Sequence, residues 1–287
     1  MKNWLCGMAL MVSPLFCYGH DLLSVGECDG FLEHLLNEKQ SWSDPQPLRG
    51  RYPSLTPDMA RIVKPFLLPS RHPIRPVLDR IFSKTRVIEN DQTLQAAGFT
   101  ILFSQKRSRI RVVHHPRLKG YLLKVYPDSE QAVLDSGWKR LAIRCIIAQK
   151  IKAIIARKKI KNFVVADKWL YRLPTPHTVQ PHQQPVLLVV KNMNIYDQKA
   201  SKEAWRTKPT RKVVRELYAI LRHGYGSSKL HANLPYTRSG KFAFIDTEYE
   251  KRPISFSHAR LFLPPSMRPY WDSLVKKEGG RVLPASN

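Results

Sequence analysis

The segment FTILFSQKRSRIRVVHHPRLKGYLLKVY, residues 99 to 126, alternates apolar runs with short polar turns. Two of the runs, Phe99 to Gln105 and Ile110 to Pro116, flank the turn KRSR, which predicts a β-hairpin. A third run, Tyr121 to Tyr126, follows Gly120. Because the three strands lie so close together in the chain, we expect them to form an antiparallel sheet.

The residues after this sheet predict one long helix and two more strands. Between Ser136 and Ile160 apolar side chains recur at helical spacing, with isoleucine at positions 143, 147, 151 and 154. Two further apolar runs, Phe163 to Tyr171 and Pro185 to Met193, predict the fourth and fifth strands.

The long helix is also strongly basic. Its polar positions are cationic or neutral, and no acidic residue lies between Asp135 and Asp167. Two interpretations are open: a core helix whose outer face is solvated, or a basic amphipathic helix that lies on an anionic membrane or on nucleic acid.

The carboxyl half predicts fewer elements. After a linker, a helix from Arg211 to His223 is ended by two glycines, Gly224 and Gly226. The run Phe242 to Asp246 predicts a buried strand after the turn RSGK. Beyond it we expect one short helix, near Pro269 to Lys277.

The first nineteen residues have the pattern of a secretory signal. One Lys precedes an apolar run from Trp4 to Phe16, and Cys17 and Gly19 stand at the small positions that a signal peptidase recognises. A membrane anchor is the alternative, but the run is short and Pro14 breaks it. The sequence therefore predicts cleavage after Gly19 and an exported protein, secreted or periplasmic.

Residues 20 to 93 form a Pro-rich, irregular extension, in which the prolines leave room only for short helices such as Pro57 to Val63 and Ile74 to Phe82. The whole chain of 287 residues carries a formal net charge of +26. A field of this sign favours polyanionic partners: nucleic acid, an anionic membrane surface, an acidic protein or nucleotide phosphates.

Asn233 follows a helix, and Asp246 ends a buried strand thirteen residues later. Together with five strands and a helix after the third, this order resembles the protein-kinase-like superfamily over residues 94 to 248. The resemblance implies an α+β fold with a five-stranded antiparallel sheet and one long helix in an N-lobe at 94–194. It also implies a shortened, mainly helical C-lobe at 195–287.

The resemblance also implies a site for ATP with Mg²⁺. Lys124, on the third strand, would neutralise the phosphates. Asn233 and Asp246 would hold the metal, with Glu248 as a further oxygen ligand. Met193 lies in the segment that would face the base.

Several positions depart from the family. Ser228 stands where the family keeps its catalytic Asp, and a serine has no base of its own to accept a proton. His231 is a candidate base in its place. The long helix offers no acid to pair with Lys124 and has Arg144 and Gln149 in the corresponding region, which leaves Asp246 or Glu248 as its partner.

The hairpin turn that would cover the phosphates contains no glycine, so its backbone amides close down less readily. Lys106, Arg107 and Arg109 are candidates to hold phosphate through their side chains. The alternative is a solvated basic turn.

Two functions follow from these observations. The first is an exported kinase-like protein that binds a metal–nucleotide complex, either as a weak phosphotransferase or as a pseudokinase. The second is a non-catalytic basic protein that binds nucleic acid, anionic lipid or an acidic partner.

Overall fold

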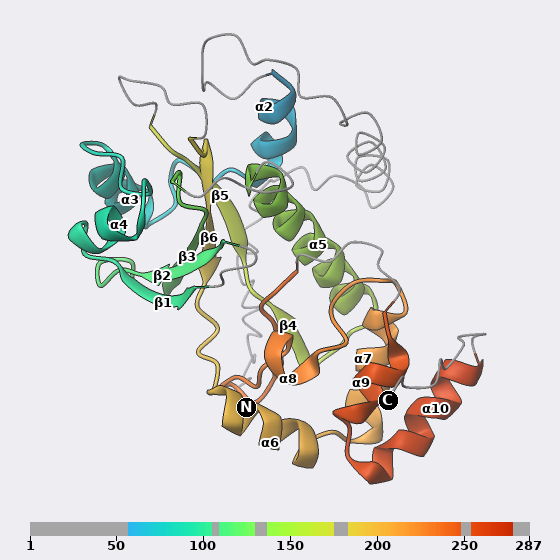
Figure 1. Cartoon of the computed structure of the whole chain (residues 1–287). Coiled ribbons are helices and arrows are strands. Elements are labelled where there is room, and N and C mark those ends of the chain that lie inside the picture. Colours follow the sequence, from blue (N-terminus) through green and yellow to red (C-terminus); the bar gives the residue numbers. More distant parts are fainter. Residues whose placement is uncertain (1–56, 105–108, 130–136, 175–182, 248–253, 278–287) are drawn as a thin grey trace, which may run out of the picture. The chain divides into compact units, whose positions relative to one another are not determined.

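The computed structural model describes residues 57–104, 109–129, 137–174, 183–247 and 254–277. Within these residues helices combine with two β-sheets, so the fold is α+β (Figure 1). The expected signal peptide at 1–19 lies outside the described residues, as do Lys106, Arg107 and Glu248.

The larger sheet has five strands: β1 (Thr100–Ser104), β2 (Arg111–His114), β3 (Tyr121–Val125), β5 (Lys168–Arg172) and β6 (Val186–Lys191). Their spatial order is β1-β2-β3-β6-β5, and every neighbouring pair is antiparallel. The prediction of a five-stranded antiparallel sheet is confirmed.

The register of β6, which lies between β3 and β5, places two lysines on one face of this sheet. Lys124 of β3 lies opposite Leu188, and Lys168 of β5 lies opposite Val190. Leu188 and Val190 are two residues apart in β6, so their side chains lie on the same face of the sheet. Their partners Lys124 and Lys168 therefore lie on that face as well. Leu123 points to the other face.

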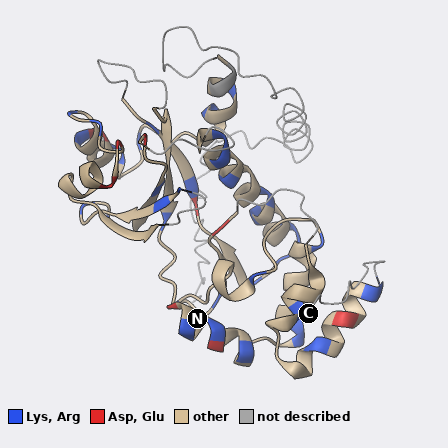
Figure 2. Ribbon diagram, in the orientation of Figure 1, with Lys and Arg blue, Asp and Glu red and all other residues tan. Residues whose placement is uncertain are grey.

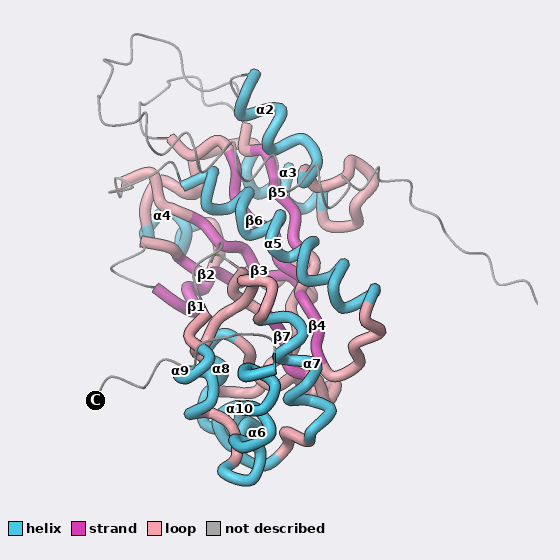
Figure 3. Tube along the Cα trace, turned by 90° about the vertical axis from the view of Figure 1, so that its right-hand side faces the viewer, coloured by secondary structure: helices cyan, strands magenta, loops and turns pink. Residues whose placement is uncertain are grey.

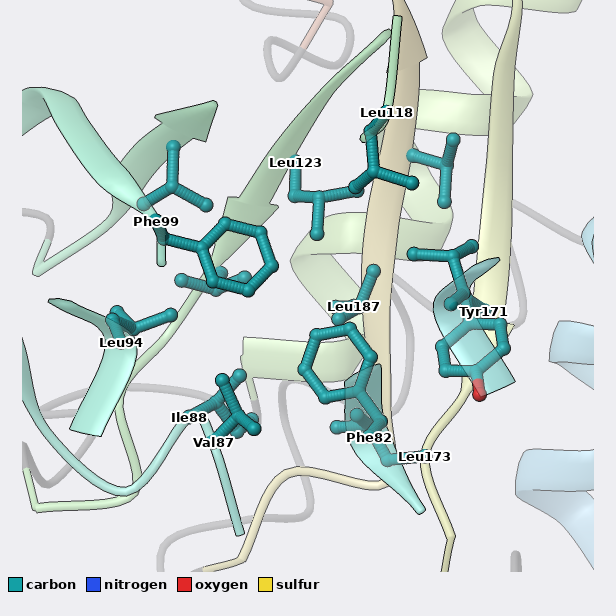
Figure 4. Close-up of a cluster of buried hydrophobic side chains, with 14 of the residues drawn as sticks. Phe82, Val87, Ile88, Leu94, Phe99, Leu118, Leu123, Tyr171, Leu173 and Leu187 are labelled. Atoms are coloured by element: carbon teal, nitrogen blue, oxygen red, sulfur yellow. The ribbon is translucent and has the colours of Figure 1, made fainter. Parts of the chain in front are cut away.

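The face that carries Leu123 packs against helices α3 (Arg75–Phe82) and α4 (Asp91–Ala96) from the Pro-rich extension (Figure 4). Side chains of both helices and of the strands form one buried cluster, which includes Leu78, Phe82, Leu94, Phe99, Leu118, Leu123, Tyr171 and Leu187. The helix α2 (Pro57–Val63) has the predicted bounds, and α3 begins one residue later than expected.

The long helix α5 (Gly137–Arg157) contacts β5, β6 and β4 (Figures 1 and 3). More than half of its residues are buried, including Arg144 and Lys150. α5 is therefore a core helix, and only its last turn and the residues after it present several exposed cations. In the described part of the chain, no helix is both long and apolar enough to cross a membrane.

The fourth predicted strand, Phe163 to Tyr171, is wrong as a single element. The chain forms β4 (Phe163–Val165), leaves the ladder at Ala166 and Asp167, and then forms β5 in the larger sheet. β4 pairs instead in parallel with β7 (Phe242–Phe244), as Figure 3 shows. The apolar residues on both sides of Asp167 and Lys168 do not reveal the change, because the two halves are buried in different sheets.

Short helices make up most of the remaining described residues: α6 (Gln198–Thr207), α7 (Arg211–Leu221), α8 (Leu230–Asn233), α9 (Phe256–Leu261), the 3₁₀ helix η3 (Pro265–Met267) and α10 (Arg268–Lys277). α7 and α10 were predicted. α6 occupies the expected linker, where the Asp197 side chain accepts a hydrogen bond from the Ala200 amide and caps the helix.

Candidate functional site

Lys124 and Asp246 come together in the structure. The Lys124 ammonium lies 3.8 Å from Asp246 Oδ1 and donates a hydrogen bond to the Ile245 carbonyl at 3.4 Å. Both side chains are mostly enclosed, at 14% and 24% exposure. Lys124 reaches this point because it lies on the face of the sheet opposite the cluster of Figure 4. Asp246 reaches it because it lies two residues after the end of β7.

Arg144 of α5 is the second cation at Asp246. Its guanidinium forms an ion pair and hydrogen bond with Asp246 Oδ1, and its side chain is 2% exposed. Burial by itself would raise the pKa of Asp246, but Arg144, Lys124 and Lys168 together hold that pKa below its usual value. Asp246 is therefore an ionised carboxylate with cationic partners on two elements.

Lys168 is the third cation near Asp246, and the sequence pattern did not mark it as a site residue. Its ammonium donates a hydrogen bond to Thr247 Oγ1 at 2.6 Å, and Thr247 Oγ1 donates in turn to the Arg144 carbonyl at 2.6 Å. Lys168 is buried, as is Thr247. The available signal was a single Lys in an apolar strand, the same signal that selected Lys124.

Burial lowers the pKa of Lys168 well below its usual range, and repulsion from Lys124 and Arg144 lowers it further. The unfolded chain therefore binds a proton that the folded chain lacks, at every pH between this lowered pKa and about 10.4. Across that interval we expect Lys168 to make stability rise with pH. Below the lowered pKa its burial is fully destabilising.

Chemical denaturation of the wild type and Lys168→Met over a series of alkaline pH values tests this expectation. The difference in unfolding free energy between the two proteins should shrink or reverse as the pH rises. The control is Lys150→Met, because Lys150 is also buried but its ammonium lies 5.6 Å from the centre of the Tyr225 ring. A pH-independent difference for Lys168→Met would contradict the assignment.

Asn233, the expected second metal ligand, ends α8 beside the strand that leads to Asp246. Its carbonyl accepts a hydrogen bond from the Ile245 amide at 3.2 Å. Its side-chain amide nitrogen donates to Ser227 Oγ at 2.8 Å. The backbone thus brings Asn233 next to the site, while its side chain is engaged by a neighbouring serine.

The two candidate catalytic residues lie near Asn233: Ser228 in the loop before α8, and His231 in α8. Each contacts a residue of α9 or the residue that follows α9. The Ser228 carbonyl pairs with His258 Nδ1 at 3.2 Å. The His231 ring packs against Phe262, with 4.7 Å between ring centres. Burial lowers the pKa of His231, and nearby basic side chains lower it further. In the described part of the chain, neither residue has a contact with Lys124 or Asp246.

The remaining candidates flank the sheet. Arg109 has a left-handed backbone, with φ of 56°, and its carbonyl accepts a hydrogen bond from Arg111 at 3.3 Å. Met193 is half-buried after β6, where the Asn192 amide donates to the Gly120 carbonyl at 2.8 Å. Lys106, Arg107 and Glu248 lie outside the described residues, so their expected roles stay predictions.

The donors present do not fit Mg²⁺. Mg²⁺ is usually held by one or two protein carboxylates together with waters and substrate phosphates, so it needs at least one carboxylate that is available to it. Among the residues that the structure describes, no group of three or more His, Cys, Asp or Glu side chains could hold a metal ion. The Asp246 carboxylate is already bound by Arg144, with Lys124 beside it. An entering cation would have to displace one positive charge and approach another.

Lys and Arg, 48 residues, outnumber Asp and Glu, 22 residues, and the imbalance is visible along the described elements (Figure 2). At the site it takes a specific form, because three cationic side chains from β3, α5 and β5 converge near Asp246. This arrangement favours an anionic ligand.

No protein-family model matches the chain, and comparison with curated proteins found no match. The kinase-like resemblance therefore depends on the order of elements and on the residues described above.

Proposed function

We propose that this protein has a diverged kinase-like fold and binds a nucleotide through its phosphate groups. The observation that carries the proposal is the approach of Lys124 to Asp246, at 3.8 Å, from two distant parts of the chain. The kinase-like resemblance requires this convergence. The five-stranded antiparallel sheet, with a long helix after its third strand, supports it further.

The proposal is for binding, with at most weak phosphotransfer. Ser228 supplies no carboxylate to orient a hydroxyl nucleophile. The ring of His231, the candidate base, packs against Phe262 with 4.7 Å between ring centres. Residues 1–19 predict export, which would bring the protein to a compartment where ATP is scarce. A binding role without catalysis, as in a pseudokinase, suits such a compartment.

Thermal and chemical denaturation of the purified protein with ATP, with and without Mg²⁺, tests nucleotide binding. A ligand at 100 times its dissociation constant adds about 2.7 kcal/mol to the free energy of unfolding. We expect this stabilisation for the wild type and for Lys119→Ala, an exposed lysine in the turn before β3. It should be lost in Lys124→Ala. No stabilisation at millimolar ATP, with or without Mg²⁺, would rule the proposal out.

The second candidate function is binding of an extended polyanion. A cluster of exposed cations begins in the last turn of α5 and continues after it, at Arg157, Lys158, Lys159 and Lys161. Because α5 itself is buried, this end of the helix is where such a partner would bind. Affinity for DNA or anionic vesicles that falls steeply with salt, and falls when these four residues become Gln, would favour this function.

A further inference from the structure

Lys168 is a buried cation with an unusual set of partners. It is 8% exposed, and its ammonium bonds to the Thr247 hydroxyl. The cations Lys124 and Arg144 are close enough to repel it, and the Asp246 carboxylate is close enough to attract it. A buried charge in such a position requires a counter-ion or the loss of its proton.

Arg144 occupies the carboxylate at which the kinase-like resemblance places a metal ion. The guanidinium is 2% exposed and bonds directly to Asp246. It carries a fixed positive charge, since arginine keeps its proton in proteins. The protein thus supplies from α5 a positive charge that a divalent cation would otherwise bring.

We propose that Lys124, Arg144 and Lys168 take the place of the divalent cation, so that the phosphate chain of the ligand binds directly to the protein without metal. The nucleotide part of this inference depends on the function proposed above. The metal-free binding of phosphate groups depends only on the three cations and Asp246.

Phosphate is the anion that these groups suit best. A polyphosphate carries several charges on tetrahedral oxygens, and charge-assisted hydrogen bonds from Lys and Arg to such oxygens are about twice as strong as neutral ones. Among the residues that the structure describes, Asp246 is a carboxylate that all three cations share. Lys168 shares the Asp246 carboxylate with Lys124 and Arg144, so a phosphate chain near Lys124 would add counter-charge beside Lys168 and favour the protonated form that its burial disfavours.

Isothermal titration calorimetry with two probes, inorganic tripolyphosphate and ATP, each in EDTA and in Mg²⁺, tests the inference. For the wild type we expect both probes to bind in EDTA, and Mg²⁺ to leave the affinity unchanged or to weaken it by competing for the phosphates.

Two variants identify the groups responsible. Lys168→Met keeps the volume of the side chain and removes its charge, and should weaken tripolyphosphate binding in EDTA by roughly tenfold to a hundredfold. Arg144→Met should weaken binding in EDTA and also make Mg²⁺ strengthen it, because the Asp246 carboxylate is then released. The matched control, Lys150→Met, removes a buried lysine of α5 and should bind as the wild type does.

The outcomes separate this inference from the proposed function. Binding of ATP only with Mg²⁺ would overturn metal-free binding and leave nucleotide binding intact. Tripolyphosphate and ATP binding equally in EDTA would support the phosphate site and argue against recognition of a nucleoside. Unchanged affinity in Lys168→Met would overturn the role of Lys168, even if Arg144→Met fails to fold. Failure of both probes under all conditions would overturn both proposals.

Discussion

Replacing Asp246 with Asn is expected to lower the free energy of unfolding by about 3 kcal/mol, because breaking a buried ion pair leaves its partner as a poorly compensated charge. Arg144 is almost fully enclosed, and Lys124 and Lys168 would then repel it and each other more strongly. The value is placed at the low end for such pairs because Asp246 is 24% exposed. Urea denaturation at neutral pH measures the change.

Asp167→Asn is the matched control. Asp167 also pairs with two lysines, Lys152 and Lys191, but its side chain is 41% exposed. Exposed pairs contribute less than about 1 kcal/mol. The double variant Arg144→Met with Asp246→Asn should recover part of the loss, since it removes both charges. If Asp246→Asn costs no more than Asp167→Asn, the buried pair is not a stabilising feature of the fold.

Trp205→Ala is expected to destabilise the protein by about 3–5 kcal/mol, the range for removal of a large buried aromatic side chain. The Trp205 ring stacks on Phe242 of β7 with 4.0 Å between ring centres, and its indole nitrogen donates to the Leu234 carbonyl at 2.9 Å. Leu234 follows Asn233, so this side chain joins α6 to both chain segments that lead into the site. Denaturant unfolding measures the loss.

Two controls define the cause. Trp205→Phe retains most of the packing but loses the hydrogen bond to the Leu234 carbonyl. It should lower the free energy of unfolding by less than Trp205→Ala does: about 1 kcal/mol for the hydrogen bond, plus a part for the apolar surface that is no longer buried. Phe103→Ala removes an aromatic side chain that is 52% exposed on β1 and should change stability by no more than about 0.5 kcal/mol. A Trp205→Ala effect as small as that of Phe103→Ala would show that α6 is not held by this contact.

The larger sheet could be predicted because its signals are local. The runs around Leu123 and Leu187 are apolar, bounded by turn residues and of strand length. The division at Ala166 and Asp167 could not be predicted, because Phe163 and Tyr171 are equally buried in two different layers. α6 was missed for a similar reason: it is held mainly by Trp205, whose contacts lie on β7 and at Leu234.

The sequence by itself determined the strands β1, β2, β3, β6 and β7 and the place of the long helix, and it selected Lys124 and Asp246 for one candidate site. It also determined that α5 has no acid for Lys124, because this is a matter of composition. Only the tertiary structure decided that Arg144 takes the Asp246 carboxylate and that Lys168 joins it. Sheet register and the packing of α5 fix those positions, and both depend on contacts between residues far apart in the chain. At the expected metal site, the Asp246 carboxylate is therefore paired with an arginine.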